Sequence, residues 1–184
     1  YPLARTQYRN MYFAGEGKAN SLRGDGRLSW DTPPASAPAD RFTYDPDAPV
    51  PSIGGNQCCG TPTPTGPRDQ HPVESRNDVL VYTSDFLEQE VDVTGPLKVV
   101  LYAGSDTPDT DFFAKLVDVY PDGKAYKVAE GAVRARYHDS LSHPQPLESN
   151  KVYKFEIDLV GTSNIFQKGH RIRVQVSSGA HPRF

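Results

Sequence analysis

The sequence has little cysteine, no long apolar run and no excess of charge of one sign. Its two cysteines, Cys58 and Cys59, are neighbours, so they cannot link distant parts of the chain and a disulfide framework is excluded. They are either free thiols or a strained vicinal disulfide. No apolar run approaches the roughly 20 residues that cross a bilayer. The formal net charge is −3 with dispersed Lys and Arg, so we expect neither a membrane nor a nucleic-acid partner.

The sequence also lacks any convincing helix of ten or more residues, and short runs rich in Val, Tyr and Phe recur instead. Such runs are typical of half-buried strands. Apolar and polar residues alternate in many of them, which places one face in the core and the other in solvent. The expected strands are 79–83, 91–94, 97–102, 112–119, 124–129, 133–137, 153–159 and 172–176. This pattern predicts an all-β fold, an antiparallel β-sandwich or jelly roll.

Composition divides the chain into three parts. Residues 1–30 predict N-terminal strands or an interdomain lead-in. Residues 31–77 are rich in proline and glycine, which excludes a central strand or a sustained helix. We expect this strap to belong to the same domain and to be draped over its surface, anchored by Phe42, Tyr44, Val50 and Ile53. Residues 78–184 are expected to form the main sandwich.

A hairpin is predicted with a specific turn. Tyr120-Pro121-Asp122-Gly123 separates two expected strands. Proline fixes φ, aspartate can bond the backbone ahead of it, and glycine accepts the left-handed conformation.

Catalytic signals are absent. There is no Gly-x-Ser-x-Gly nucleophile elbow, and Ser177-Ser178 end a strand without a nearby base. None of the five histidines has a zinc-site spacing. We expect His170 to make a structural hydrogen bond to a loop carbonyl and His71 to be exposed. No catalytic residue and no cofactor is predicted.

An acidic cluster, Asp106, Asp109 and Asp111, has two interpretations. Carboxylates are the ligands that Ca²⁺ prefers, but a calcium loop usually spaces them more densely and regularly. Turn chemistry, or pairing of Asp109 or Asp111 with Arg134 or Arg136, is the favoured reading.

Trp30 also has two interpretations. An exposed indole could stack on a sugar, and this makes a carbohydrate-binding jelly-roll module the alternative function. Aromatic rings in β-domains more often lie in the core or at domain contacts. A third reading is an interaction domain that uses a sandwich face.

Several segments, in order, carry a family resemblance. They are Asp78-Val-Leu-Val-Tyr-Thr, Val93-Thr-Gly-Pro-Leu, Asp109-Thr-Asp-Phe, Leu116-Val-Asp-Val-Tyr-Pro-Asp-Gly, Val133-Arg-Ala-Arg-Tyr, Ile157-Asp-Leu and Phe166-Gln-Lys-Gly-His-Arg-Ile-Arg-Val-Gln-Val-Ser-Ser. Together they resemble the C-terminal domain of X-Pro dipeptidyl-peptidase and cocaine-esterase-like serine hydrolases. Leu22-Arg-Gly-Asp-Gly-Arg-Leu and Asp45-Pro-Asp-Ala-Pro-Val-Pro-Ser-Ile-Gly-Gly resemble the linker into that domain.

The resemblance implies a non-catalytic jelly roll, similar to galactose-binding domains, that packs on an α/β-hydrolase domain of the same protein. That domain would hold a Ser-Asp-His triad upstream of Tyr1 and cleave acyl-ester or amide bonds, including X-Pro peptide bonds. The jelly roll would wall the active-site cleft and supply an oligomer interface. The resemblance also implies that the sandwich continues past Phe184, so we expect it to be truncated there.

Overall fold

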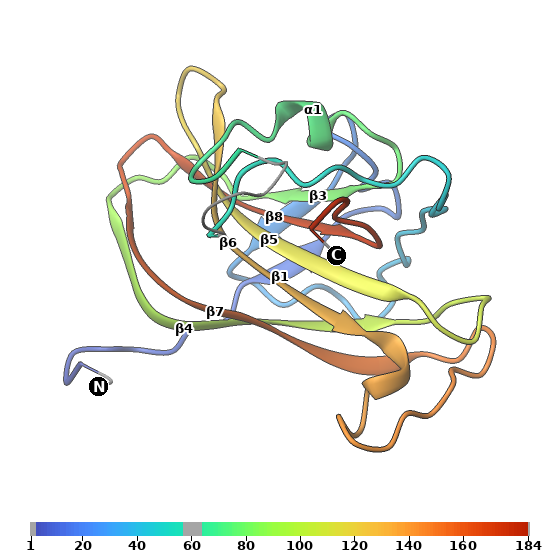
Figure 1. The fold of residues 1–184 in the computed structure, drawn as a ribbon. Helices are drawn as coiled ribbons and strands as arrows, with labels where there is room; N and C mark the ends of the chain where they lie inside the picture. The colour runs from blue at the N-terminus through green and yellow to red at the C-terminus, as the bar shows by residue number, and fades with distance from the viewer. Residues whose placement is uncertain (1–2, 57–63, 184) are drawn as a thin grey trace.

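The computed structural model describes residues 3–56 and 64–183, and strands dominate it (Figure 1). The strands are β1 (Tyr12–Ala14), β2 (Arg27–Ser29), β3 (Leu80–Thr83), β4 (Val91–Ala103), β5 (Asp111–Val119), β6 (Ala125–Arg134), β7 (Tyr153–Phe166) and β8 (Arg171–Ser177). Within the described ranges, helical structure is confined to α1 (His71–Glu74) and a 3-10 turn at Ala135–Tyr137. The predicted all-β class is confirmed. The predictions for Cys58, Cys59 and Phe184 lie outside the described residues.

The strands form two layers. Six of them make one sheet in the order β1-β2-β3-β8-β5-β6, and β4 pairs with β7 in a second sheet. In Figure 1 the long β4–β7 pair curves across one side of the larger sheet. The paired strands are antiparallel except β2 and β3, which meet in parallel where Arg27 pairs with Thr83. An antiparallel sandwich was therefore the correct expectation for the main body, and the N-terminal hairpin joins it by a parallel contact.

The main core lies between the two sheets. Phe112 and Leu116 on β5 belong to the same buried cluster as Phe155 and Ile157 on β7. The rings of Phe112 and Phe155 are 4.9 Å apart between centroids. Burying a side chain of this size stabilises the fold by about 1.5–3 kcal/mol. Burial along β7 follows the alternation of the sequence, which is why its inward positions were predictable.

One strand is longer than expected. Residues 91–94 and 97–102 were predicted as separate strands, but β4 runs through Pro96 without a break. The register against β7 shifts between Pro96 and Lys98. Proline has no N–H to donate to the neighbouring strand. The shift in register at this position accommodates the missing hydrogen bond, so the strand continues past Pro96.

Two other expected strands are partly joined. Residues 124–129 and 133–137 were predicted as separate strands, but β6 runs without a break from Ala125 to Arg134, and a 3-10 turn replaces the end of the second one. Asp109 accepts a hydrogen bond from the Arg136 N–H at 2.9 Å, and Ala135 N–H bonds Thr110 O at 2.8 Å. These contacts from the loop before β5 bend the chain away from the ladder.

The predicted hairpin turn between β5 and β6 is confirmed. Tyr120 N–H donates to Lys124 O at 2.8 Å, and Asp122 Oδ1 accepts from Lys124 N–H at 3.1 Å. Gly123 has a φ of 89°, the left-handed conformation that glycine adopts without strain.

The strap lies on the outer face of the six-stranded sheet. Val50 and Val73 are fully buried and pack with Val79 and Val81 in a second apolar cluster. Phe42 packs against the main core. Because the strap covers this face, β3 is buried on both sides.

Tyr82 ties the strap to the main core. Its hydroxyl donates to Asp40 Oδ2 at 2.8 Å, and Asp40 Oδ1 also accepts from Ala19 N–H at 2.7 Å. Hydrogen bonds to charged groups contribute about 1.5–3 kcal/mol. We expect Tyr82→Phe to lower the free energy of unfolding by about 1–2 kcal/mol in urea denaturation. An unchanged unfolding midpoint would show that this bond does not hold the strap.

Candidate functional site

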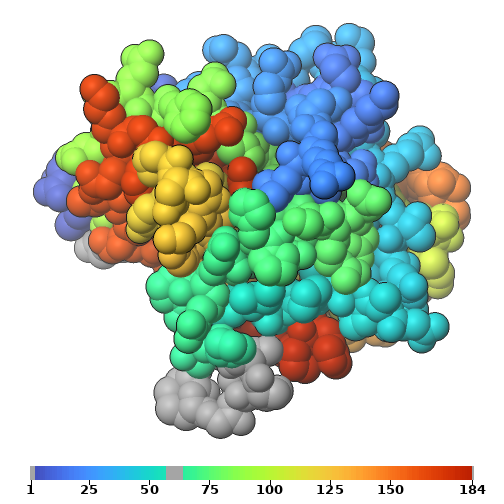
Figure 2. Space-filling model, turned by 90° about the horizontal axis from the view of Figure 1, so that it is seen from above, coloured from blue at the N-terminus to red at the C-terminus, as the bar shows by residue number. Residues whose placement is uncertain are grey.

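A polar cleft lies where the loop between β1 and β2 meets β3 and β8. Its volume is about 570 Å³. Figure 2 shows this end of the molecule, with the N-terminal segment in blue beside the green segment that carries β3. The lining residues are Gly15, Glu16, Ser21, Leu22, Gly24, Asp25, Gly26, Arg27, Val81, Thr83, Asp85, Arg171 and Arg173.

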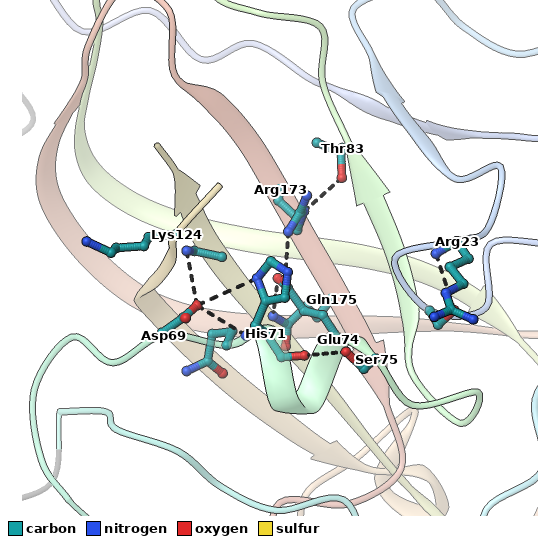
Figure 3. A network of polar contacts seen from close by, with 12 residues as sticks. Arg23, Asp69, His71, Glu74, Ser75, Thr83, Lys124, Arg173 and Gln175 are labelled. Carbon is teal, nitrogen blue, oxygen red and sulfur yellow. Dashed lines mark hydrogen bonds and ion pairs between the residues drawn. The ribbon is translucent and has the colours of Figure 1, made fainter. Parts of the chain in front are cut away.

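Arg173 is the most firmly held side chain of the cleft (Figure 3). Its Nε donates to Thr83 Oγ1 at 2.8 Å, and its Nη1 donates to Glu74 Oε2 at 2.7 Å. Glu74 is fully buried on α1, and its other oxygen accepts from Gln175 Nε2 at 2.8 Å. The strap thus supplies the buried carboxylate that fixes an arginine of the main sheet.

The opposite wall of the cleft is fixed by its backbone. Asp25 accepts hydrogen bonds from the N–H groups of Glu16 and Lys18 at 3.1 and 3.2 Å. A Cβ at Gly26 would overlap the carbonyl oxygen of Val81, so only glycine lets this loop approach β3 so closely.

The chemistry of the cleft is suited to polar contact. Its charged lining consists of three arginines and three carboxylates: Arg27, Arg171, Arg173, Glu16, Asp25 and Asp85. Its lining contains no histidine or cysteine. A serine nucleophile needs an adjacent base, so the cleft offers hydrogen bonds and charges without a nucleophile–base pair.

Arg171 borders the cleft beside an exposed ring. Its Nε donates to Ser84 O at 2.6 Å, and its guanidinium lies 5.1 Å from the ring centroid of Phe86. Burial lowers the pKa of Arg171, with the charge of Arg173 as a second cause. The side chain is therefore oriented by the protein before any partner binds.

A second polar cluster lies under the strap. Lys127 Nζ donates to Glu130 Oε2 at 2.8 Å and to Gly54 O at 2.7 Å. Arg183 forms an ion pair with the other oxygen of Glu130. The strap, β6 and the C-terminal tail thus meet at one buried carboxylate.

Lys115 extends from β5 into the same covered face. It is 1% exposed, and its Nζ has no hydrogen-bond partner among the described residues. Burial lowers the pKa of Lys115 to about 7, with the positive charge of Lys127 as the next cause. An unpaired buried ammonium destabilises a fold, so this side chain costs stability whenever it is charged.

The acidic cluster of the sequence does not come together as a set of ligands. Arg134 binds Asp111 through two hydrogen bonds of 2.9 and 3.0 Å, and Arg136 Nε lies 2.8 Å from Asp109 Oδ2. The predicted pairing with arginine is confirmed. In the part of the chain that the structure describes, no group of three or more His, Cys, Asp or Glu side chains is arranged to hold a metal ion.

The histidines take structural positions. His71 is exposed, as expected, near Asp69. For His170 the expected partner was wrong: its Nδ1 lies 2.9 Å from Asp118 Oδ1, a buried carboxylate rather than a loop carbonyl. Ser177 is buried and donates to Gly179 O at 3.2 Å, which occupies its hydroxyl.

Trp30 lies at the surface instead of in the core. Its side chain is 43% exposed, and the guanidinium of Arg9 lies 4.6 Å from the ring centroid. That cation covers one face of the ring.

Sequence reasoning missed the two covered polar clusters. The alternation in β8 predicted Arg173 and Gln175 on a solvated face, but they are 7% and 1% exposed. This expectation was wrong because the strap covers the face. Glu74 follows Pro72-Val73 in the strap, and nothing in that sequence marks it as a buried partner.

Comparisons with known proteins agree with this architecture. The whole chain, residues 1–184, matches the family described as X-Pro dipeptidyl-peptidase C-terminal non-catalytic domain. It is 44% identical to cocaine esterase from Rhodococcus sp. (strain MB1 Bresler), over all of this chain and 32% of that protein. The chain therefore spans about a third of the length of this relative.

Solved structures show the same fold. An α-amino acid ester hydrolase matches with a TM-score of 0.78 and 30% identity, over 94% of this chain and 29% of its own. An aminopeptidase from a Thaumarchaeota archaeon of marine sediment matches with a TM-score of 0.77 and 28% identity, over 93% of this chain and 30% of its own.

No helix in the described ranges is long and apolar enough to cross a membrane. The sandwich, the polar cleft without a nucleophile–base pair and the match over the full chain lead to one assignment. This chain belongs to the family of X-Pro dipeptidyl-peptidase C-terminal non-catalytic domains, the C-terminal domain of CocE/NonD-type hydrolases.

Proposed function

We propose that this domain packs on the catalytic α/β-hydrolase domain of the same protein and forms one wall of its active-site cleft. The match of the whole chain to a C-terminal non-catalytic family carries the proposal. The parent protein would be a serine hydrolase that cleaves acyl-ester or X-Pro amide bonds. The names of the relatives, an esterase, an ester hydrolase and an aminopeptidase, support this range of reactions.

The domain has the structural properties of a rigid scaffold. The strap and the C-terminal tail are joined by hydrogen bonds, with Ser52 N–H donating to His181 O at 2.7 Å and His181 N–H donating to Val50 O at 2.9 Å. A rigid scaffold fixes the positions of the surface residues that contact a neighbouring domain. A contact with a second copy of the protein is part of the same proposal, and light scattering of the longer protein tests it.

The first test compares this chain with the longer protein. The 184-residue chain is expected to hydrolyse neither short-chain p-nitrophenyl esters nor aminoacyl-p-nitroanilides, because its family is described as non-catalytic. Ser142 Oγ lies 2.9 Å from His143 Nδ1, but both residues are on an exposed loop and neither lines the cleft. The longer protein should hydrolyse at least one of them and lose that activity with a serine-directed phosphonate. Phosphonate-sensitive turnover by the short chain would contradict the proposal.

A further inference from the structure

The N-terminal arm, residues 3–11, extends away from the sandwich (Figure 1). Its internal hydrogen bond joins Thr6 N–H to Leu3 O at 2.9 Å. Within the described part of the chain, no hydrogen bond ties residues 3–9 to the strands. Ordering an extended segment costs about 1–2 kcal/mol per residue, so this arm needs contacts that the domain alone does not provide.

The arm carries large apolar side chains into solvent. Tyr8 is 68% exposed and Leu3 is 41% exposed. Arg9 connects the arm to Trp30, which is 43% exposed just after β2. Tyr, Trp and Arg are the residue types enriched at the centres of protein interfaces. We call Leu3, Tyr8, Arg9 and Trp30 the arm patch.

Another exposed aromatic residue lies in a less suitable setting. Tyr102 on β4 is 69% exposed, but the outer face of the β4–β7 sheet also carries a charge network. Lys98 and Lys154 bind Glu156 at 3.0 and 2.6 Å. Burying that network would require removing three charges from water, which is costly. The arm patch has one charge, already placed over an aromatic ring.

The position of the arm identifies its partner. In a C-terminal domain, the chain before the arm leads to the catalytic part of the protein. The arm runs directly into β1, so a domain that precedes the arm in the chain is joined to the sandwich at this end. The interface between two domains of one chain buries roughly 600–1,500 Å², more than the arm alone supplies, so Trp30 and the neighbouring edge of β1 are included.

We propose that the arm patch and the free edge of β1 form the surface that binds the catalytic domain of the same protein. This inference rests on the proposed function and adds the location of the contact. In the assembled protein, Tyr8 and Trp30 are buried anchors, and Tyr102 remains in solvent.

Hydroxyl-radical footprinting of the protein that carries both domains tests this directly. Tyr8 and Trp30 should be oxidised several-fold more slowly than their exposure in this domain implies. Tyr102, with nearly the same exposure as Tyr8, is the internal control and should react at the rate of a free tyrosine. The measurement is repeated at low concentration, where the protein is a monomer.

Each outcome has a distinct meaning. Protection of Tyr8 and Trp30 in the monomer supports the inference. Fast oxidation of both, with another surface of this domain protected, overturns it and leaves the packing of the two domains intact. No protected surface anywhere in this domain overturns the proposed function as well. Protection that disappears on dilution assigns the patch to a second copy and overturns the inference.

A variant pair gives an independent readout. Tyr8→Asp should leave the sandwich unchanged, because the side chain of Tyr8 is 68% exposed, and Tyr102→Asp, at 69% exposure, is the matched control. In the two-domain protein, Tyr8→Asp should separate thermal unfolding into two transitions, and Tyr102→Asp should leave it as in the parent protein. The same profile for both variants would contradict the inference.

Discussion

Replacing Glu74 by alanine is expected to lower the free energy of unfolding of this chain by about 3–5 kcal/mol. The carboxylate is fully buried and accepts hydrogen bonds from Arg173 and Gln175. Without it, a guanidinium that is only 7% exposed loses its counter-charge and stays in a site that is largely closed to water. Urea denaturation followed by tryptophan fluorescence or far-UV circular dichroism measures the change.

Matched variants separate charge from packing. Glu74→Gln keeps an acceptor oxygen and should lose less stability than the alanine variant. The double variant Glu74→Leu with Arg173→Met removes both charges and should recover most of the loss, because buried ion pairs are often replaceable by apolar side chains. A loss below about 1 kcal/mol in Glu74→Ala would show that Arg173 is hydrated in solution.

Replacing Lys115 by methionine is expected to stabilise the chain by about 1–4 kcal/mol at pH 6. The ammonium is buried, has no hydrogen-bond partner among the described residues and faces the positive charges of Lys127 and Arg183, with Glu74 as the opposing charge. Methionine has a similar length and flexibility and carries no charge. Chemical denaturation at pH 6 measures the gain, and the exposed Lys168, replaced by methionine, is the control.

The same lysine makes stability depend on pH in a defined direction. Burial lowers the pKa of Lys115 from 10.5 to about 7 in the folded chain. Between these values the unfolded chain binds a proton that the folded chain does not. Stability should therefore rise with pH by up to about 1.4 kcal/mol per unit from about pH 7 to about pH 10. Burial also lowers the pKa of Lys127 to about 7, so Lys115→Met should reduce this slope and leave the contribution of Lys127. An unchanged slope would show that Lys115 does not contribute to it.

The sandwich could be predicted from the sequence, because the alternation of apolar and polar residues indicates which side chains are buried wherever one face of a strand is exposed to solvent. Residues 153–159 and the turn at Tyr120–Gly123 are examples, since their local chemistry and their final environment agree. The continuity of β4 through Pro96 was not predictable, because it depends on how β7 pairs with it. Local propensity contains no information about that register.

The polar clusters were not readable, because burial of the outer face depends on a segment far away in sequence. In the sequence, Arg173 and Gln175 have the pattern of the solvent-exposed face of a strand. They are buried because residues 50–74 cover that face. The pairs of Asp109 and Asp111 with arginine were predictable, since the hairpin places their strands side by side. Short-range pairing can be inferred from order along the chain, and coverage by a long loop cannot.

The parallel contact between β2 and β3 has a practical consequence for dissecting the parent gene. If the expressed sequence began after Trp30, at the start of the proline-rich stretch, it would lack β1 and β2. The large sheet would then end at β3, whose edge would be unpaired. An uncovered strand flank of this kind recruits other chains and promotes aggregation. Subcloned versions of this domain should therefore begin ahead of Tyr12.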